Sequence, residues 1–126
     1  MQVEYLDHLV LTVRDLSATC TFYTCVLGMS ELSFGEGRKA LAFGAQKINL
    51  HQYGNEFEPK SKQPTPGSAD LFLLRRNRCR AWPFICAPMI SLWKNGPIER
   101  SGAQGPILSL YFRDPDANLI EVSNYL

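Results

Sequence analysis

The chain has 126 residues and a mass of 14.2 kDa, enough for one compact domain or two small modules, which excludes a large multidomain enzyme. With 45% hydrophobic and 20% charged residues, the composition is that of a globular protein rather than a disordered one. The formal charge is +1, and no apolar run approaches the roughly 20 residues of a membrane helix, so neither nucleic acid nor membrane is an expected partner.

The opening segment and the cysteines indicate a cytoplasmic protein. The segment MQVEYLDH is not basic, and Asp7 and His8 interrupt the apolar core that a signal peptide would need. The spacings between the cysteines match no zinc pattern, so we expect reduced structural thiols. The four cysteines are Cys20, Cys25, Cys79 and Cys86.

The first half of the chain predicts one strand, one helix and three further strands. Residues 6–13 (LDHLVLTV) are typical of a strand buried largely on both faces, with His8, Val10 and Thr12 on one side. An amphipathic helix follows, with Asp15 or Ser17 as its N-cap and a stop at Gly28. Three strands are predicted next, with the sequences MSELSFG, RKALAFG and QKINLHQ.

The second half repeats this order weakly. Residues 53–67 are rich in proline and glycine and are typical of a connector. Strands are predicted at 68–74, 107–113 and 118–126, with the turn sequence DPDAN between the last two. Aligning LDHLVLTV with SADLFLL, and the strand of Ile48 with that of Ile120, suggests an internal duplication. We expect a single α+β domain, 1–126, with module one at about 4–55, the connector proper at 56–67 and module two at 68–126.

Residues 75–94 do not fit the duplication. A helix is expected there, but Pro83 and Pro88 lie inside the segment, and an interior proline costs about 3 kcal/mol. Two interpretations are open: a basic patch for an anionic partner, or a locally altered segment such as a pair of compensating frameshifts, which would make this a decayed copy. The segment concentrates the positive charges Arg75, Arg76, Arg78, Arg80 and Lys94.

Three polar side chains inside apolar strands are candidates for chemistry, because such positions are costly unless paired or bound. They are His8, His51 and Glu121, and two histidines with a carboxylate are a usual ligand set for a divalent metal. Asp70 occupies the position that the duplication pairs with His8. Taken singly, each is more often a satisfied core or surface residue, and it is their joint pattern that indicates a site. The sequence contains no G-x-S-x-G, P-loop or H-E-x-x-H motif, and Cys20 and Cys25 are expected to pack.

Two segments resemble a known superfamily. DHLVLTVRDLSATCTFYTCVLGM resembles the opening, and FRDPDANLIEVSNY the closing signature, of the vicinal oxygen chelate superfamily of glyoxalases, bleomycin resistance proteins and extradiol dioxygenases. The resemblance covers about residues 4–74 and 95–126 and is nearest to the glyoxalase-domain-containing protein 5 type.

The resemblance implies a fold and a metal. The fold is a pair of βαβββ modules in a half-open curled sheet, often as a homodimer, and the metal is a divalent ion (Zn, Ni, Mn or Fe(II)). Residue by residue, it carries two ligands over to His8 and Glu121. Where relatives have a further glutamate this chain has Asn49, with His51 two residues on, and where they have a second histidine it has Asp70. The expected ligands are therefore His8, His51 and Glu121, with Asp70 either a fourth ligand or a structural acceptor.

The implied activity is that of a lyase or isomerase on a small molecule whose vicinal oxygens chelate the metal, with Glu121 as the base. Tyr111 and Arg113 share one strand face and are candidates for contacting an anionic substrate, although Arg113 is equally placed to pair with Asp114 or Asp116. An extradiol-type dioxygenase, or a non-catalytic drug-sequestering binding protein of the same fold, remains an alternative. The substrate and any use of glutathione are left open.

Overall fold

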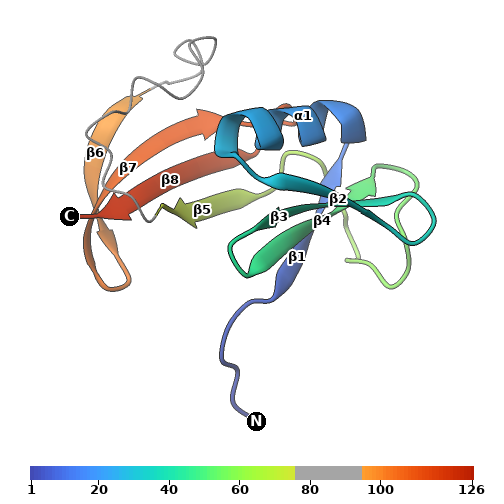
Figure 1. Cartoon of the computed structure of the whole chain (residues 1–126), viewed down its shortest axis with the longest axis horizontal. Helices are drawn as coiled ribbons and strands as arrows, with labels where there is room; N and C mark the ends of the chain where they lie inside the picture. The colour runs from blue at the N-terminus through green and yellow to red at the C-terminus, as the bar shows by residue number, and fades with distance from the viewer. Residues whose placement is uncertain (76–94) are drawn as a thin grey trace. The chain divides into compact units, whose positions relative to one another are not determined.

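The computed structural model describes residues 1–75 and 95–126 and divides the chain into two units, unit 1 (Met1–Gly67) and unit 2 (Ser68–Leu126) (Figure 1). Unit 1 contains the predicted strand, helix and three strands. Its sheet has the order β1-β4-β3-β2, with β1 parallel to β4 and the other neighbours antiparallel. The elements are β1 (His8–Val13), α1 (Leu16–Leu27), β2 (Ser30–Phe34), β3 (Arg38–Phe43) and β4 (Gln46–Gln52).

The ends of α1 follow the expected capping chemistry. Asp15 is the N-cap, and its Oδ1 accepts a hydrogen bond from the Ala18 backbone N–H at 2.9 Å. Gly28 ends the helix in the left-handed conformation, with φ of 65°, which a residue with a Cβ rarely adopts. The stop at Gly28 is confirmed, and the structure selects Asp15 over Ser17 as the N-cap.

The core of unit 1 lies between α1 and one face of the sheet. Tyr23 of the helix is fully buried, and so are Leu41 and Ile48 of the sheet. The expectation that the first strand is buried on both faces is wrong, because burial is confined to residues 11–13 and Val10 is 48% exposed. The face of β1 that carries Val10 points away from the helix-covered core.

Unit 2 has the same sheet topology, with the order β5-β8-β7-β6 and β5 parallel to β8. The sequence did not predict β6, because NGPIERSG has a glycine and a proline near its start and no alternation of apolar residues. The segment is a strand because it pairs with β7. The helix expected at 75–94 and the basic patch lie outside the described residues, apart from Arg75. The strands are β5 (Asp70–Leu74), β6 (Asn95–Gly102), β7 (Gly105–Arg113) and β8 (Leu119–Tyr125).

The DPDAN sequence forms a turn that is closed by buried side chains. Asp114 Oδ1 accepts from the backbone N–H groups of Asp116 and Asn118, at 2.9 and 2.8 Å, and its Oδ2 accepts from Asn118 Nδ2 at 2.8 Å. Asn118 Oδ1 in turn accepts from the backbone N–H of Ala69 at 2.9 Å. The residue with positive φ is Ala117, at 69°, rather than the asparagine that the sequence favours there. The turn therefore joins the start of β5 to the β7–β8 connection.

Unit 1 has the expected βαβββ order, unit 2 has the corresponding four strands, and the α+β class is confirmed. No helix among residues 1–75 and 95–126 has the length and apolar character needed to span a bilayer.

Candidate functional site

One face of the unit 1 sheet gathers the polar side chains that the sequence singled out. Two residues that pair across parallel strands project from the same face of the sheet. Along one strand, every second residue projects from that face. His8 pairs with Lys47, Val10 with Asn49 and Thr12 with His51. We call this the His8 face, formed by His8, Val10, Thr12, Lys47, Asn49 and His51.

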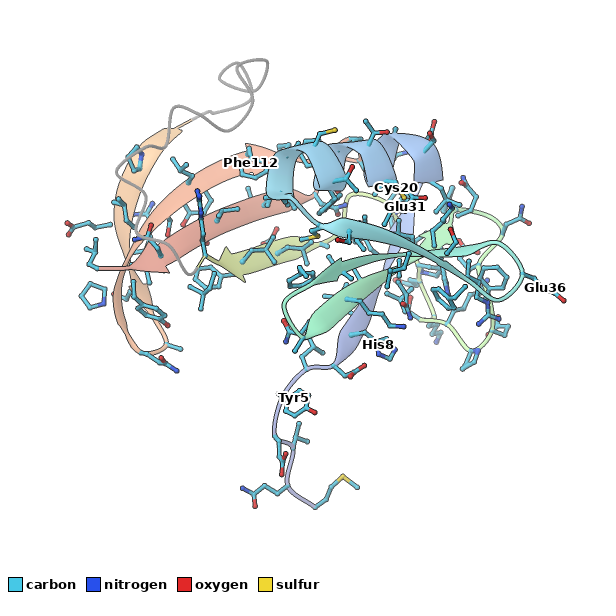
Figure 2. The ribbon with its side chains drawn as sticks, in the orientation of Figure 1. Tyr5, His8, Cys20, Glu31, Glu36 and Phe112 are labelled. Carbon is cyan, nitrogen blue, oxygen red and sulfur yellow. The ribbon has the colours of Figure 1, made fainter. Side chains whose placement is uncertain are left out.

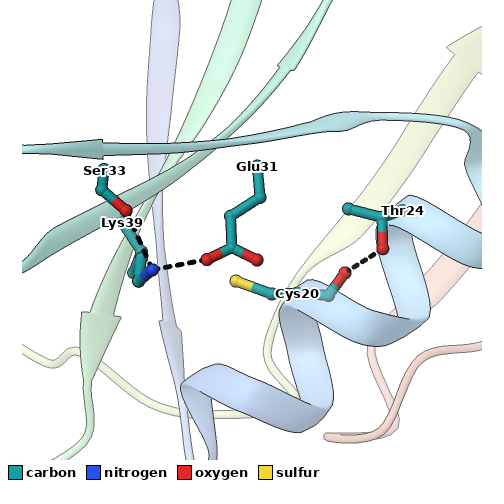
Figure 3. A network of polar contacts seen from close by, with 5 residues as sticks. All are labelled: Cys20, Thr24, Glu31, Ser33 and Lys39. Carbon is teal, nitrogen blue, oxygen red and sulfur yellow. Dashed lines mark hydrogen bonds and ion pairs between the residues drawn. The ribbon is translucent and has the colours of Figure 1, made fainter.

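The opposite face of the sheet meets α1 and has a structural network (Figure 3). Lys39 Nζ donates to Glu31 Oε1 at 2.5 Å and to Ser33 Oγ at 2.9 Å, close to the buried thiol of Cys20. Burial raises the pKa of the Cys20 thiol, and the neighbouring Glu31 carboxylate acts in the same direction. A protonated, buried thiol is a poor nucleophile, so this face contributes packing rather than chemistry.

His8 stands at the start of β1 and is partly exposed (Figure 2). Its Nδ1 lies 2.6 Å from Asp7 Oδ2, and a carboxylate in that position accepts the Nδ1 proton. The lone pair of Nε2 is then available to a ligand. Histidines that bind metals are usually held in this way, with the second ring nitrogen donating to a carboxylate.

Asn49 lies two positions along from His8 on the His8 face. From the spacing of strands and residues, their Cα atoms are about 8 Å apart. The Oδ1 atom of Asn49 is buried and has no hydrogen-bond partner among the described residues. An unsatisfied buried acceptor is costly, at about 1–3 kcal/mol, so this oxygen is a natural place for a cation or a donor from a bound molecule.

The structure does not bring His8 and His51 together. His51 pairs with Thr12, four positions from His8, which places the two Cα atoms about 14 Å apart. Side chains that project in parallel from one face at that separation do not reach a common ion. His51 instead packs edge-on against Phe57, with ring centroids 5.5 Å apart, and the Arg38 guanidinium lies 4.3 Å above the same Phe57 ring.

His51 is held in its neutral form. Burial lowers its pKa, and the nearby cations of Arg38 and Lys60 act in the same direction, against the opposing charge of Glu56. A neutral imidazole has one donor and one acceptor nitrogen, and among the described residues His51 has a ring contact and nearby charges but no hydrogen bond. His51 is therefore free to bond a molecule that enters beside it.

A pocket of about 230 Å³ lies next to His51, roofed by the connector. Within the connector, Lys60 Nζ donates to Glu56 Oε2 at 3.2 Å, and Glu56 Oε1 accepts from the Gly54 backbone N–H at 2.9 Å. The pKa of Glu56 is lowered by that backbone donor and by Lys60, so the carboxylate stays charged and holds Lys60 in place. The pocket is lined by Val10, Thr12, His51, Pro59, Lys60, Ser61 and Pro64.

Unit 2 presents two carboxylates on one face of its sheet. Glu121 pairs with Phe72 across β5 and with Tyr111 across β7, while Asp70 pairs with Leu119. Asp70 and Glu121 are thus two positions apart on neighbouring parallel strands, about 8 Å between Cα atoms.

A short chain of hydroxyls orients Glu121. Ser123 Oγ donates to Glu121 Oε1 at 3.4 Å and lies 2.7 Å from the Oγ of Ser109. Both serines are fully buried. Because the Ser123 hydroxyl contacts Oε1, the other carboxylate oxygen of Glu121, Oε2, remains for a proton or a cation.

The two units repeat the same geometry. In each, a residue of the first strand lies two register positions from a residue of the last, giving His8 with Asn49 in unit 1 and Asp70 with Glu121 in unit 2. The counterpart of Glu121 is therefore Asn49, and the counterpart of His51 is Ser123. The sequence held this signal, since the alignment of Ile48 with Ile120 already places Asn49 opposite Glu121.

The expected substrate contacts in β7 have partners within unit 2. Arg113 Nη1 donates to the backbone oxygen of Ala117 at 3.1 Å, which ties this side chain to the turn. Tyr111 lies under the Arg100 guanidinium, 5.8 Å from the ring centroid. Tyr111 shares a face with Glu121 and so keeps its place beside the carboxylate.

Each pair by itself has donors that suit a divalent cation: in unit 1 an imidazole nitrogen backed by a carboxylate and an unsatisfied amide oxygen, and in unit 2 two carboxylates. Within neither unit do the described residues bring three or more His, Cys, Asp or Glu side chains together. Each unit therefore offers a pair of ligand positions rather than a complete set.

Comparison with known proteins gives the family. Residues 5–82 match the model of the Glyoxalase/Bleomycin resistance protein/Dioxygenase superfamily. The chain belongs to this superfamily, as the opening and closing motifs indicated.

Relatives of known sequence or structure agree. The chain is 54% identical over 127 residues to the Virulence protein STM3117 of Salmonella typhimurium, covering 100% of this chain and 88% of that protein. The crystal structure of STM3117 matches with a TM-score of 0.90 at 50% identity, over 100% of both chains. The chain is also 54% identical over 126 residues to the Glyoxalase domain-containing protein RDO1 of Mycosarcoma maydis, covering 99% of this chain and 70% of that protein.

A more distant structure shares the fold. TnmS3, an antibiotic binding protein from Streptomyces sp. CB03234, matches with a TM-score of 0.71 at 20% identity, over 100% of this chain and 99% of that one. A binding protein therefore also has this architecture, and the fold alone does not decide between catalysis and binding.

Proposed function

We propose that the chain is a glyoxalase-like enzyme that depends on a divalent metal and acts as a lyase or isomerase on a small molecule with neighbouring oxygen atoms. The observation that carries this proposal is the repeated register of His8 with Asn49 and of Asp70 with Glu121. Members of this superfamily usually bind divalent metals and small molecules.

The residues fit such an ion individually. His8 offers Nε2 because Asp7 holds Nδ1, and Asn49 offers a buried oxygen that nothing else satisfies. Asp70 and Glu121 supply negative charge. Unit 1 thus offers one nitrogen and one oxygen ligand and unit 2 offers carboxylate oxygens, and these ligand types occur with Zn, Ni, Mn and Fe(II) alike.

A bound divalent ion would polarise the substrate oxygens and stabilise the negative charge that develops on them. The protein's own contribution is the base. Glu121 Oε1 is held by Ser123, so Oε2 is the atom that takes a proton from the substrate carbon and returns it. Tyr111, opposite Glu121 in β7, limits where the reacting carbon can lie.

Metal content of the purified full-length chain tests this proposal. After incubation with Zn, Ni, Mn or Fe(II) and removal of free ions, we expect near-stoichiometric metal by mass spectrometry. His8→Gln, Asn49→Ala and Glu121→Gln should each lower occupancy by roughly tenfold or more, because each removes a ligand. A screen of small hydroxy- and oxo-carbonyl compounds, with and without glutathione, would follow with the ion retained.

Two variants serve as controls for the ligand assignment. Glu99→Gln removes an exposed carboxylate from β6 of the unit 2 sheet, on the face opposite Glu121. This variant should retain the metal. His51→Gln should also retain it, because His51 is too far from His8 to share the ion. Wild-type protein that binds none of the four ions, or equal loss in both controls, would contradict the proposal.

A non-catalytic small-molecule binding protein is the second candidate, favoured by one observation. Lys47 pairs directly with His8, so a cation is present beside a proposed ligand. Positive charge opposes binding of a metal ion. A binding protein would keep its affinity for its small molecule after treatment with a chelator, whereas the enzyme would lose its activity.

A further inference from the structure

The pocket beside His51 is the feature that the proposed function leaves unused. At about 230 Å³ it is smaller than the roughly 300 Å³ at which sites for drug-sized ligands begin, so it suits one chemical group rather than a whole drug. It lies within unit 1, between β1, β4 and the connector. It is therefore a subsite for part of a small molecule.

The wall of this pocket consists of hydrogen-bond donors and apolar surface. Thr12 and Ser61 provide hydroxyls, His51 provides a ring nitrogen and Lys60 provides an ammonium, while no carboxylate lines the pocket. Val10 and the prolines supply the apolar part.

Lys60 keeps donors free for a ligand. An ammonium has three N–H donors, and its hydrogen bond to Glu56 at 3.2 Å uses one of them. Glu58 Oε1, at 3.8 Å, forms an ion pair with this ammonium but is too distant for a second hydrogen bond. Glu56 thus positions Lys60 without saturating it, and the donors that remain suit an oxyanion.

The pocket also lies at a short distance from the proposed ligand positions. His51 is two residues beyond Asn49 on the same strand and the same face, which corresponds to roughly 7 Å. A small molecule whose oxygens lie near Asn49 therefore spans the distance to the pocket with a few bonds.

We propose that the pocket formed by Thr12, His51, Lys60 and Ser61 binds a carboxylate group of the substrate. The substrate class is then a small carboxylic acid whose chelating oxygens lie within roughly 7 Å of the carboxylate. The position of those oxygens rests on the proposed function, whereas carboxylate binding in the pocket does not.

The test uses metal-free full-length protein with propionate as the probe, which cannot chelate through vicinal oxygens. The chain has two histidines, so the imidazole C–H region of the NMR spectrum contains two sets of signals, assigned with His8→Gln. Propionate at constant pH and ionic strength should shift the His51 signals in a saturable way and leave those of His8 unchanged. Propionamide, its neutral counterpart, should bind at least about tenfold more weakly, because it lacks the charge that Lys60 recognises.

Matched lysine variants complete the test. Lys60→Gln should weaken propionate binding by about tenfold, and Lys60→Arg should restore most of it. Lys62→Gln makes the same charge change at an exposed lysine outside the pocket and should leave the affinity unchanged. No saturable shift of His51, equal binding of propionate and propionamide, or equal loss in both glutamine variants would overturn the proposal. Because no metal is present, that failure is distinct from failure to bind metal.

Discussion

Asn49 shows how one residue changes the candidate site. From the sequence, His51 was the more attractive ligand, because imidazole is the commoner metal ligand and lies on the same strand face. The register shows that His51 is four positions from His8 and that Asn49 is the residue equivalent to Glu121. The alignment of the two modules already pointed to Asn49, and strand pairing decided for it by separating His51 from His8.

The lowered pKa of His51 predicts a pH dependence of stability. Unfolded, His51 takes up a proton near its ordinary pKa of 6.5, whereas the folded protein resists protonation until a lower pH. The unfolded state then binds more protons, so the free energy of unfolding should fall as the pH is lowered below 6.5 toward the folded pKa. Urea unfolding between about pH 7.5 and 5.5 should show a smaller decrease for His51→Gln than for wild type.

His8→Gln is the control for this pH dependence. It removes the other histidine of the chain and keeps His51 with its neighbours Phe57, Arg38 and Lys60. If the two glutamine variants flatten the profile equally, burial of His51 is not its cause.

At the scale of elements, local chemistry fixed some boundaries and pairing fixed others. Asp15 and Gly28 set the ends of α1 through capping and positive φ, which single residues can specify. By contrast, β6 has no strand pattern and is a strand because β7 supplies its hydrogen-bond partners. The closing motif contributes mainly to structure, since Asp114 and Asn118 bond backbone groups of the turn and of the start of β5.

Asn118→Ala should destabilise unit 2. Asn118 is fully buried, and its loss deprives Asp114 Oδ2 of a donor and the Ala69 N–H of its acceptor. We expect the free energy of unfolding to fall by about 2–4 kcal/mol in urea titrations.

An exposed asparagine provides the comparison. Asn55 lies in a turn of unit 1, where its backbone N–H donates to the Gln52 oxygen, so Asn55→Ala should change stability by less than about 0.5 kcal/mol. Similar losses in the two variants would show that the buried turn network does not add to stability.

At the scale of the molecule, the chain consists of two units with one sheet topology and belongs to a superfamily whose members are often dimers. We therefore predict a homodimer. Light scattering coupled to size-exclusion chromatography should give twice the chain mass of 14.2 kDa at micromolar concentration. A mass of 14.2 kDa that is independent of concentration would contradict the prediction.

The sequence alone determined the family, the βαβββ order of the first half and the C-terminal end of α1, because these depend on local periodicity, capping and contiguous motifs. It also placed His8 and Glu121 correctly in the first and last strands. Tertiary structure decided the rest. Strand register separated His51 from His8 and so chose Asn49, which the alignment of the two modules had already placed opposite Glu121. The pocket forms because the connector folds onto β1 and β4 and brings Lys60 and Ser61 beside them. Nothing in the sequence indicated these two residues, because their roles arise from contacts between residues far apart in the chain.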